Sequence, residues 1–307
     1  MRILFMGTPE IAATMLRALA AQQEICGVFC QPDKPVGRKQ ILTAPPVKQL
    51  ALQLGVPVYQ PVKLRDGTAE ACIRSLAPDL IAVVAYGRIL PKALLDIPPR
   101  GCVNIHASLL PQYRGAAPIQ RAVENGDAVT GVTAMYMDEG MDTGDIIEMV
   151  RVPIGDTDDA ASMFDKLGEA GAALLVKTVR AIESGTAVRT PQPADGCTLA
   201  PPITKQEGLF GFSDDARRIV NKTRAFCQWP NAYFQIKGKT VKVLRAAHVS
   251  ETGEAGAVLA RDPLTVAARG GAVQLLEVKP EGGRAMTGAQ WAAGLRLKIG
   301  DRIPTEV

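Results

Sequence analysis

Short apolar runs alternate with amphipathic stretches over the first part of the chain. The predicted strands are Ile3–Met6, Ile25–Cys30, Val56–Tyr59, Leu80–Tyr86 and Cys102–Ile105. Leu80–Tyr86 is apolar throughout, which is typical of a central strand covered on both faces. After the first run, Met15, Leu16 and Leu19 recur at helical spacing. This alternation of strands and helices predicts an α/β fold with a doubly wound, mostly parallel sheet.

The pattern changes in the second half of the chain. Further strands are predicted at Thr133–Met137 and Ile146–Val152, followed by a long helix over Ala160–Ser184. Residues 185–212 hold four Pro and four Gly, which is typical of a linker. A helix over Asp214–Cys227 and several short apolar runs follow, and they favour a small β-barrel. The predicted organisation is a first domain over 1–184, a linker over 185–212 and a second domain over 213–307.

Charge is distributed unevenly along the chain. The whole sequence carries 35 basic and 31 acidic residues, a net charge of +4. Residues 1–205 hold 20 basic and 21 acidic side chains, whereas residues 206–307 hold 15 and 10. Residues 216–250 contain eight basic side chains and no acidic one. The asymmetry indicates small-molecule chemistry in the first part and a polyanionic partner for the second.

Composition and spacing also argue against several classes of protein. No apolar run approaches the roughly 18–20 residues that span a bilayer, and the first residues do not resemble a signal peptide. We therefore expect a cytoplasmic protein without membrane contact. The six cysteines form no CxxC pair, and His106 and His248 are the two histidines, so we expect no metal centre. Gly7-Thr8-Pro9 lacks the GxGxxG spacing, which favours a tight turn over a dinucleotide site.

Asn104 and His106 are the first candidates for chemistry. They stand two residues apart on a predicted strand, so their side chains point to the same side. An amide can donate to a carbonyl oxygen that gains negative charge, and an imidazole can accept a proton near neutral pH. The pair predicts a catalytic site at the end of that strand, although a lone histidine is more often structural.

A second candidate is the segment Met137–Asp145, which carries four acidic residues and two glycines after a predicted strand. One of its carboxylates could orient His106 and stabilise the protonated imidazole, as in a catalytic triad. The spacing does not match an EF-hand calcium loop. A polar hairpin without catalytic function is the competing interpretation.

Taken together, these motifs resemble the folate-dependent formyltransferase superfamily. They are FMGTPE at 5–10, QPDKPVGR at 31–38, PPVK at 45–48, NIH at 104–106, SLLPQYRG at 108–115, GAAPIQ at 115–120, GVT at 131–133 and DTGD at 142–145. The likeness is dense over residues 1–150 and thinner beyond 200, where WPNAY at 229–233 and VKV at 241–243 are the main matches. It implies a formyltransferase-type, Rossmann-like domain followed by an OB-like β-barrel.

The resemblance also implies an activity and the residues that carry it. Members of the matching branch move a formyl group from 10-formyltetrahydrofolate to the α-amine of methionine on initiator tRNA. Asn104 would bind the formyl oxygen, His106 would take the amine proton, and Asp142 would hold the imidazole. The residues expected at the folate are Tyr86, Gly87, Arg88, Ile89, Leu90, Ser108, Leu109, Leu110, Pro111 and Asp138. The resemblance implies no metal, and we expect a monomer.

The basic second part would hold the tRNA. The residues expected to contact it are Arg38, Lys39, Lys205, Arg217, Lys237, Lys239 and Lys242. Arg38 and Lys39 belong to a segment, 31–43, whose alternative interpretation is an exposed mobile loop. Phe226, Trp229, Tyr233 and Phe234 could stack on bases. At least two of these four are expected in the core instead.

Two other functions compete with this interpretation. One is formylation of a nucleotide-linked amino sugar or a ribonucleotide, which the basic second part disfavours. The other is an RNA-binding module fused to an idle domain, which the presence of Asn104, His106 and Asp142 disfavours. The chain departs from the family at Leu209–Gly211, where an Arg and an Ile-Asp pair are usual. That departure weakens the expected contacts of the segment but leaves the chemistry unaffected.

Overall fold

The computed structural model describes residues 1–37 and 39–303. They form two compact units. The first unit comprises residues 1–118, 129–153 and 164–201, and the second comprises residues 119–128, 154–163 and 202 onward. Among the described residues, no helix is both long and apolar enough to cross a membrane.

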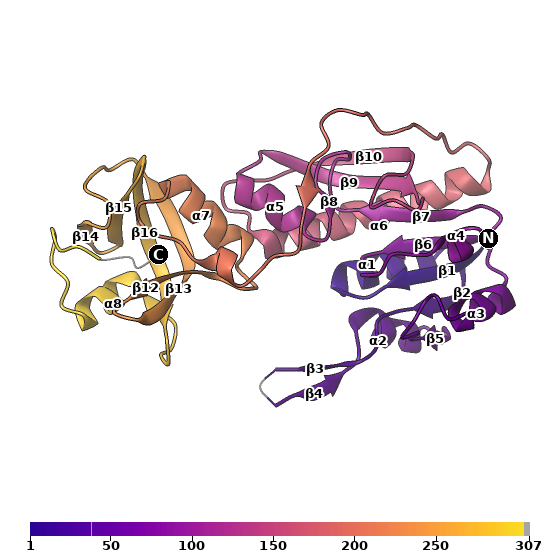
Figure 1. Ribbon diagram of the computed structural model, residues 1–307, viewed down its shortest axis with the longest axis horizontal. Helices are drawn as coiled ribbons and strands as arrows, with labels where there is room; N and C mark the ends of the chain where they lie inside the picture. The colour runs from indigo at the N-terminus through magenta and orange to yellow at the C-terminus, as the bar shows by residue number, and fades with distance from the viewer. Residues whose placement is uncertain (38, 304–307) are drawn as a thin grey trace. The chain divides into compact units, whose positions relative to one another are not determined.

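A seven-stranded sheet forms the centre of the first unit, in the order β10-β9-β7-β6-β1-β2-β5 (Figure 1). The strands are β1 Arg2–Gly7, β2 Glu24–Phe29, β5 Val58–Tyr59, β6 Leu80–Val84, β7 Cys102–His106, β9 Val129–Tyr136 and β10 Ile146–Pro153. The five neighbouring strands β5, β2, β1, β6 and β7 run parallel to one another, whereas β9 is antiparallel to β7 and β10 is antiparallel to β9. The prediction of a mostly parallel sheet is confirmed.

Helices cover both faces of this sheet, as a doubly wound fold requires. They are α1 Glu10–Ala20, α2 Pro46–Gln53, α3 Thr68–Leu76, α4 Lys92–Leu95 and α6 Ala160–Glu183. Ile73 of α3 and Leu94 of α4 pack with Leu4 and other strand residues in one buried cluster. On the other face, a Cβ atom at Gly171 of α6 would lie 2.2 Å from Met15 Cε of α1. The glycine therefore allows the two helices to pack closely.

The segment predicted as a loop over residues 31–43 contains a β-hairpin. Its strands are β3 Lys34–Val36 and β4 Ile41–Thr43 (Figure 1). Val36, Ile41 and Leu42 are each more than half exposed. The expected exposure is therefore confirmed, and the segment contains paired strands as well as a loop. Arg38 lies outside the described residues.

An antiparallel sheet forms the core of the second unit, in the order β12-β13-β16-β15-β14, with β17 paired to β16. Its strands are β12 Ala232–Ile236, β13 Lys239–Val249, β14 Val258–Arg261, β15 Leu264–Ala268, β16 Gly271–Pro280 and β17 Met286–Thr287. The helices are α5 Pro118–Asn125, α7 Ala216–Ala225 and α8 Gly288–Gly294, with a 3-10 turn at Gln206–Gly208. Short strands after an amphipathic helix were predicted here, and the structure confirms them.

Aromatic residues fill the centre of the second unit. Phe210, Phe212 and Phe234 have ring centroids 5.4–5.7 Å apart, and Trp291 packs edge-on against Phe234. Phe226 and Phe234 are fully buried. The expectation that at least two of the four aromatic residues lie in the core is therefore confirmed, and base stacking is wrong for these two. Trp229, by contrast, is 57% exposed.

The predicted linker is not irregular throughout. Within residues 185–212, β11 (Leu199–Ala200) pairs in parallel with β8 (Arg114–Gly115). Thr190 exchanges backbone hydrogen bonds with Ile146 at the start of β10. The high Pro and Gly content hid these short pairings, because each spans only one or two residues. The sequence-based domain limits at 184 and 213 stay predictions.

Candidate active site

Strand β7 places Asn104 and His106 on one face of the sheet. The intervening Ile105 is buried on the opposite face, beside Gly171 of α6, where an added Cβ atom would lie 3.3 Å from Ile105 Cγ2. Asn104 pairs with Met135 of β9, and His106 pairs with Thr133. The two candidate side chains therefore emerge together, as their spacing predicted.

His106 is 6% exposed and has a defined hydrogen-bond partner. Its Nε2 lies 2.9 Å from the backbone oxygen of Tyr113. Because a carbonyl oxygen can only accept, Nε2 carries the proton and Nδ1 holds the lone pair. Nδ1 lies 3.7 Å from Asp142 Oδ1. Nδ1 is therefore the ring atom that can take a proton, and the resulting imidazolium would face a carboxylate.

Asp142 occupies the position where the two side chains of β7 converge. Its Oδ1 lies 3.5 Å from Asn104 Nδ2, and its Oδ2 accepts a 2.9 Å hydrogen bond from Gly115 N. The structure thus brings the predicted trio of Asn104, His106 and Asp142 together. Their catalytic roles stay predictions.

Hydrogen bonds also fix the loop that supplies the Tyr113 carbonyl. Thr133 Oγ1 donates to Ser108 O at 2.6 Å and accepts from Leu110 N at 3.2 Å. Ser108 Oγ donates to Gln112 O at 2.6 Å. Thr133 stands opposite His106 in the sheet, so the same strand pair that orients the imidazole also anchors the loop beside it.

The residues predicted at the folate divide into buried and exposed ones. Tyr86, Leu90, Ser108 and Leu110 are buried, and burial raises the pKa of the Tyr86 hydroxyl to about 12. The remaining members are half-buried or exposed, namely Gly87, Arg88, Ile89, Leu109, Pro111 and Asp138.

Two of these positions already have structural partners. Asp138 Oδ1 accepts from Gly140 N at 3.0 Å and from Thr143 Oγ1 at 2.6 Å, which shapes the loop before Asp142. Arg88 Nε donates to Gln31 Oε1 at 3.2 Å. These contacts order both segments and leave their predicted part in folate binding untested.

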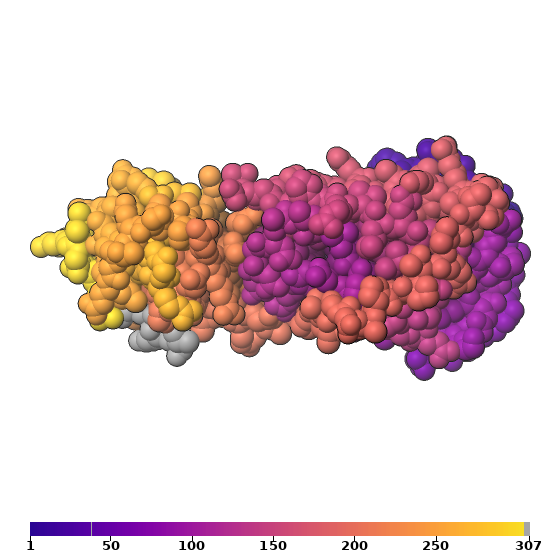
Figure 2. All heavy atoms as spheres, turned by 90° about the horizontal axis from the view of Figure 1, so that it is seen from above, coloured from indigo at the N-terminus to yellow at the C-terminus, as the bar shows by residue number. Residues whose placement is uncertain are grey.

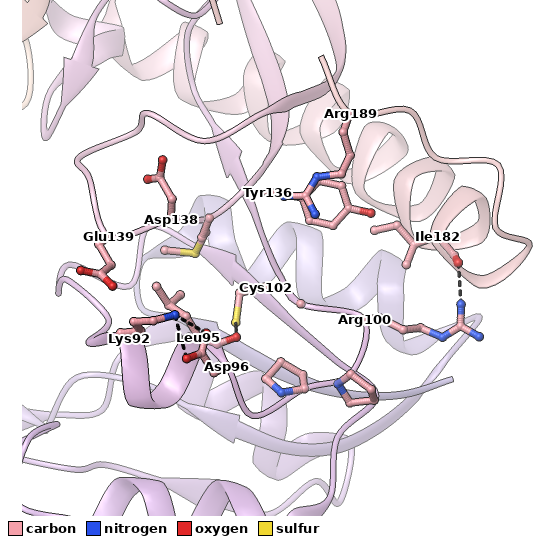
Figure 3. A pocket seen from close by; sticks show the side chains of 14 residues that line it. Lys92, Leu95, Asp96, Arg100, Cys102, Tyr136, Asp138, Glu139, Ile182 and Arg189 are labelled. Atoms are coloured by element: carbon pink, nitrogen blue, oxygen red, sulfur yellow. Dashed lines mark hydrogen bonds and ion pairs between the residues drawn. The ribbon is translucent and has the colours of Figure 1, made fainter. Parts of the chain in front are cut away.

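A cavity of about 690 Å³ lies beside Asp138 in the first unit (Figure 3). Lys92 pairs with Asp96 at 2.9 Å within its lining. Arg189 stacks over the Tyr136 ring at 4.1 Å and also pairs with Asp145. The trio is not part of the lining. Lys92 and Arg189 of the lining therefore already have acidic partners within the first unit.

The basic residues predicted to contact tRNA differ in their exposure to solvent. Lys39, Lys205, Arg217, Lys237 and Lys239 are exposed. Lys242 is half-buried, and its Nζ donates to Asn231 Oδ1 at 3.0 Å. In the sheet of the second unit, Lys242 lies between Tyr233 of β12 and Lys279 of β16. Lys279 therefore lies on the same face of this sheet as Lys242.

Three groups of the site were not predicted as functional. They are the Tyr113 carbonyl, the Gly115 N–H and the side chain of Gln192, whose contacts are given below. The motif SLLPQYRG contains Tyr113 and Gly115, but their contributions come from backbone atoms, which no side-chain pattern indicates. Gln192 stands between two prolines in the predicted linker, where no sequence signal indicates a role. Among the described residues, no three His, Cys, Asp or Glu side chains gather as metal ligands would.

Comparison with known families agrees with this geometry. The model of the family described as "Formyl transferase" matches residues 1–179, and the one described as "Formyl transferase, C-terminal domain" matches residues 202–296. The chain belongs to the formyl transferase family. The formyl transferase match at 1–179 contains all three residues of the trio.

Curated relatives of similar length support the assignment to this family. The chain is 44% identical to the methionyl-tRNA formyltransferase of Geobacter sulfurreducens, over 99% of this chain and 96% of that protein. It is 46% identical to the methionyl-tRNA formyltransferase of Myxococcus xanthus, over 98% of this chain and 97% of that protein. It is 47% identical to the one of Neisseria meningitidis serogroup B, over 99% and 100%.

Solved structures with the same fold are more distant. An N-formyltransferase of Helicobacter canadensis, in complex with folinic acid and dTDP-3-aminofucose, superposes with a TM-score of 0.67 at 20% identity, over 88% of this chain and 97% of that one. HypX of Aquifex aeolicus, in complex with tetrahydrofolic acid, superposes with a TM-score of 0.63 at 18% identity, over 100% of this chain and 50% of that one. At these identities the likeness concerns the fold alone.

Proposed function

We propose that this formyl transferase moves the formyl group of 10-formyltetrahydrofolate to the α-amine of methionine on initiator tRNA. The observation that carries the proposal is the 44–47% identity to methionyl-tRNA formyltransferases over both units. The geometry of the trio supplies groups suited to that chemistry. The folate derivative is the formyl donor and is consumed, and no metal takes part.

In the proposed reaction, the neutral α-amine attacks the formyl carbon. A new C–N bond forms to the amine, and the bond between the formyl carbon and N10 of the folate breaks. His106 Nδ1 takes the proton that the amine loses, directly or through water, and N10 gains a proton as it leaves. The Nε2–H bond to Tyr113 O holds the tautomer that leaves Nδ1 free to act.

Asn104 and Asp142 have separate roles in this scheme. Asn104 Nδ2 donates to the formyl oxygen as it becomes an oxyanion, a role for which one donor typically contributes about 10²–10³ in rate. Asp142 stabilises the imidazolium formed at His106 and is itself held by Gly115 N. The 3.5 Å and 3.7 Å separations around Asp142 Oδ1 are longer than usual hydrogen bonds, and such contacts commonly tighten when substrates bind.

The folate lies, in this proposal, against the segments 86–90 and 108–111 and beside Asp138. Because several of these side chains are buried in the core, backbone N–H and C=O groups make the polar contacts with the pterin. The tRNA backbone is held by the exposed cations of the second unit and by the hairpin that carries Lys39. We also propose that the enzyme is a cytoplasmic monomer.

The test is direct measurement of formyl transfer. The full chain is incubated with a labelled formyl donor and aminoacylated initiator tRNA, and formylmethionine is quantified after deacylation. Elongator Met-tRNA and a dTDP-amino sugar serve as alternative acceptors. Preferential labelling of the initiator species supports the proposal, and labelling of the sugar alone overturns it.

A further inference from the structure

The side-chain amide of Gln192 makes hydrogen bonds to two segments beside the trio. One is the loop 137–145, and the other contains Arg114. Gln192 Nε2 donates to Asp142 O at 2.8 Å and to Gly144 O at 2.9 Å. Its Oε1 accepts from Arg114 Nε at 3.1 Å and also from the terminal guanidinium nitrogen. A primary amide has two donor hydrogens and one acceptor oxygen, so every polar group of Gln192 is engaged.

The loop that Gln192 holds has a conformation that needs support. Asp142 has a φ of 54°, in the left-handed region that costs most residues with a Cβ roughly 1 kcal/mol or more. At Gly144, a Cβ would lie 1.8 Å from Tyr136 O, so the backbone there is tightly packed. A backbone in this state persists only where its surroundings hold it. The two carbonyls bound by Gln192 flank the turn.

The other end of the amide acts on the loop beside His106. Arg114 is followed by Gly115, whose N–H binds the Asp142 carboxylate, and is preceded by Tyr113, whose carbonyl binds His106 Nε2. Gln192 therefore connects the segment that carries Asp142 with the segment that orients the imidazole.

The chain around Gln192 strengthens this connection. Residues 190–200, here called the strap, run over the surface of the first unit, where they are coral in Figure 2. Thr198 O accepts from Arg114 N at 2.9 Å, and Thr198 Oγ1 accepts from Tyr113 N at 2.8 Å. Ala200 O accepts from Ala116 N at 2.9 Å. The strap thus binds the loop through hydrogen bonds at Tyr113, Arg114 and Ala116.

We propose that Gln192 is a positioning residue for formyl transfer, which sets the place of the Asp142 carboxylate relative to His106 and Asn104 without contacting substrate. The inference rests on the proposed function and extends it to a residue outside the trio. A displacement of about 1 Å at a reacting group can cost on the order of 10²-fold in rate. Loss of the amide should therefore lower kcat and leave substrate binding nearly intact.

The experiment compares Gln192→Leu and Gln192→Glu in the full chain. Leu retains the size of the side chain without polar groups, whereas Glu retains an acceptor for Arg114 and replaces the two donors. Gln53→Leu, an exposed glutamine at the end of α2, is the matched control. Initial rates give kcat and both KM values, thermal melting reports folding, and hydrogen exchange reports residues 140–146.

We expect both Gln192 variants to lose about 10–100-fold in kcat, with each KM changed less than about threefold and exchange of residues 140–146 accelerated. Unchanged kcat in either well-folded variant overturns the inference, as does a rise of KM with kcat retained. If one variant has a much lower melting temperature than the unsubstituted chain, the kinetics of the other variant decide whether the inference holds. Absence of formyl transfer by the unsubstituted chain would instead refute the proposed function, and exchange at residues 140–146 would still test the contact.

Discussion

In the first unit, the trio predicted to be catalytic is assembled from β7 and the loop 137–145, and backbone groups of a third segment bind its side chains. In the second unit, the basic residues lie mostly exposed on strands and turns, and few of them have fixed partners. Asp142 meets Gly115 N at 2.9 Å and faces two side chains. Lys237 and Lys239 extend into solvent.

The difference follows from what each region has to do. Proton transfer requires groups placed within a fraction of an ångström, so the site depends on a network of directional contacts. Phosphate binding by long cations requires mainly a high local charge, so individual contacts can vary. Substitutions in the first region should therefore act on kcat and be severe, and those in the second should act on tRNA affinity and be graded.

The most severe test of the comparison is His106→Ala. Removal of the proton acceptor should lower kcat by about 10²–10⁴-fold, the usual contribution of a general base. Equilibrium dialysis with the folate should show little change in affinity. His248→Ala, at the other histidine, lies on β13 of the second unit and is the control. A His106 variant with normal turnover would contradict the assigned role.

Asn104→Ala should have the next largest effect. Loss of the oxyanion donor predicts a fall in kcat of about 10²–10³-fold, with KM for both substrates within a few-fold of normal. Steady-state kinetics with each substrate varied in turn separates these parameters. An effect confined to KM would show that Asn104 contributes to substrate binding and not to stabilisation of the transition state, which would contradict its assigned role.

Substitution of Lys237, Lys239 and Lys242 by Gln together tests the second region. Each lost phosphate contact should reduce the slope of log affinity against log salt by about 1, and the affinity for tRNA should fall in proportion. The folate affinity and the single-turnover rate at saturating tRNA should stay normal. A triple variant at Lys63, Lys92 and Lys177 in the first unit removes the same charge and should not alter the slope.

The smallest expected effect concerns stability rather than activity. In the second unit, Arg121 contacts Glu207 at 2.6 Å and Glu124 at 2.8 Å. Burial acts to raise the pKa of Glu207, but hydrogen bonds from Arg121 and Thr204 outweigh it and hold the pKa below its ordinary value of 4.5. The charged form therefore stabilises the fold above that pH, and this contribution is lost as the pH falls below it.

Glu207→Gln should accordingly lower the free energy of unfolding by about 1–3 kcal/mol at pH 7. The difference in the free energy of unfolding between the variant and the unsubstituted chain should become smaller as the pH falls below 4.5. Denaturant titration at several pH values measures this difference. Glu251→Gln, at an exposed acidic residue, is the control. A difference that does not depend on pH would mean that the Glu207 charge contributes nothing.

Much of the fold followed from local patterns. Leu80–Tyr86 predicted the buried strand β6, and Ala160–Ser184 predicted α6 to within a residue. The hairpin β3–β4 and the pairing of β8 with β11 were not predicted, because their exposed or one- to two-residue strands leave no periodic signal. Asn104 and His106 could be paired from spacing, whereas Asp142 depended on resemblance to a family.

The sequence by itself determined the alternation of strands and helices, the separation of charge between the two parts and the candidate pair of Asn104 and His106, since each is encoded in residue type and spacing along the chain. Tertiary structure decided which ring nitrogen of His106 is free, which backbone groups hold Asp142 and that Gln192 joins the two loops. Those contacts join residues up to 78 positions apart, such as Arg114 and Gln192, and involve backbone atoms common to every residue type. Only the folded chain brings such groups within hydrogen-bonding distance.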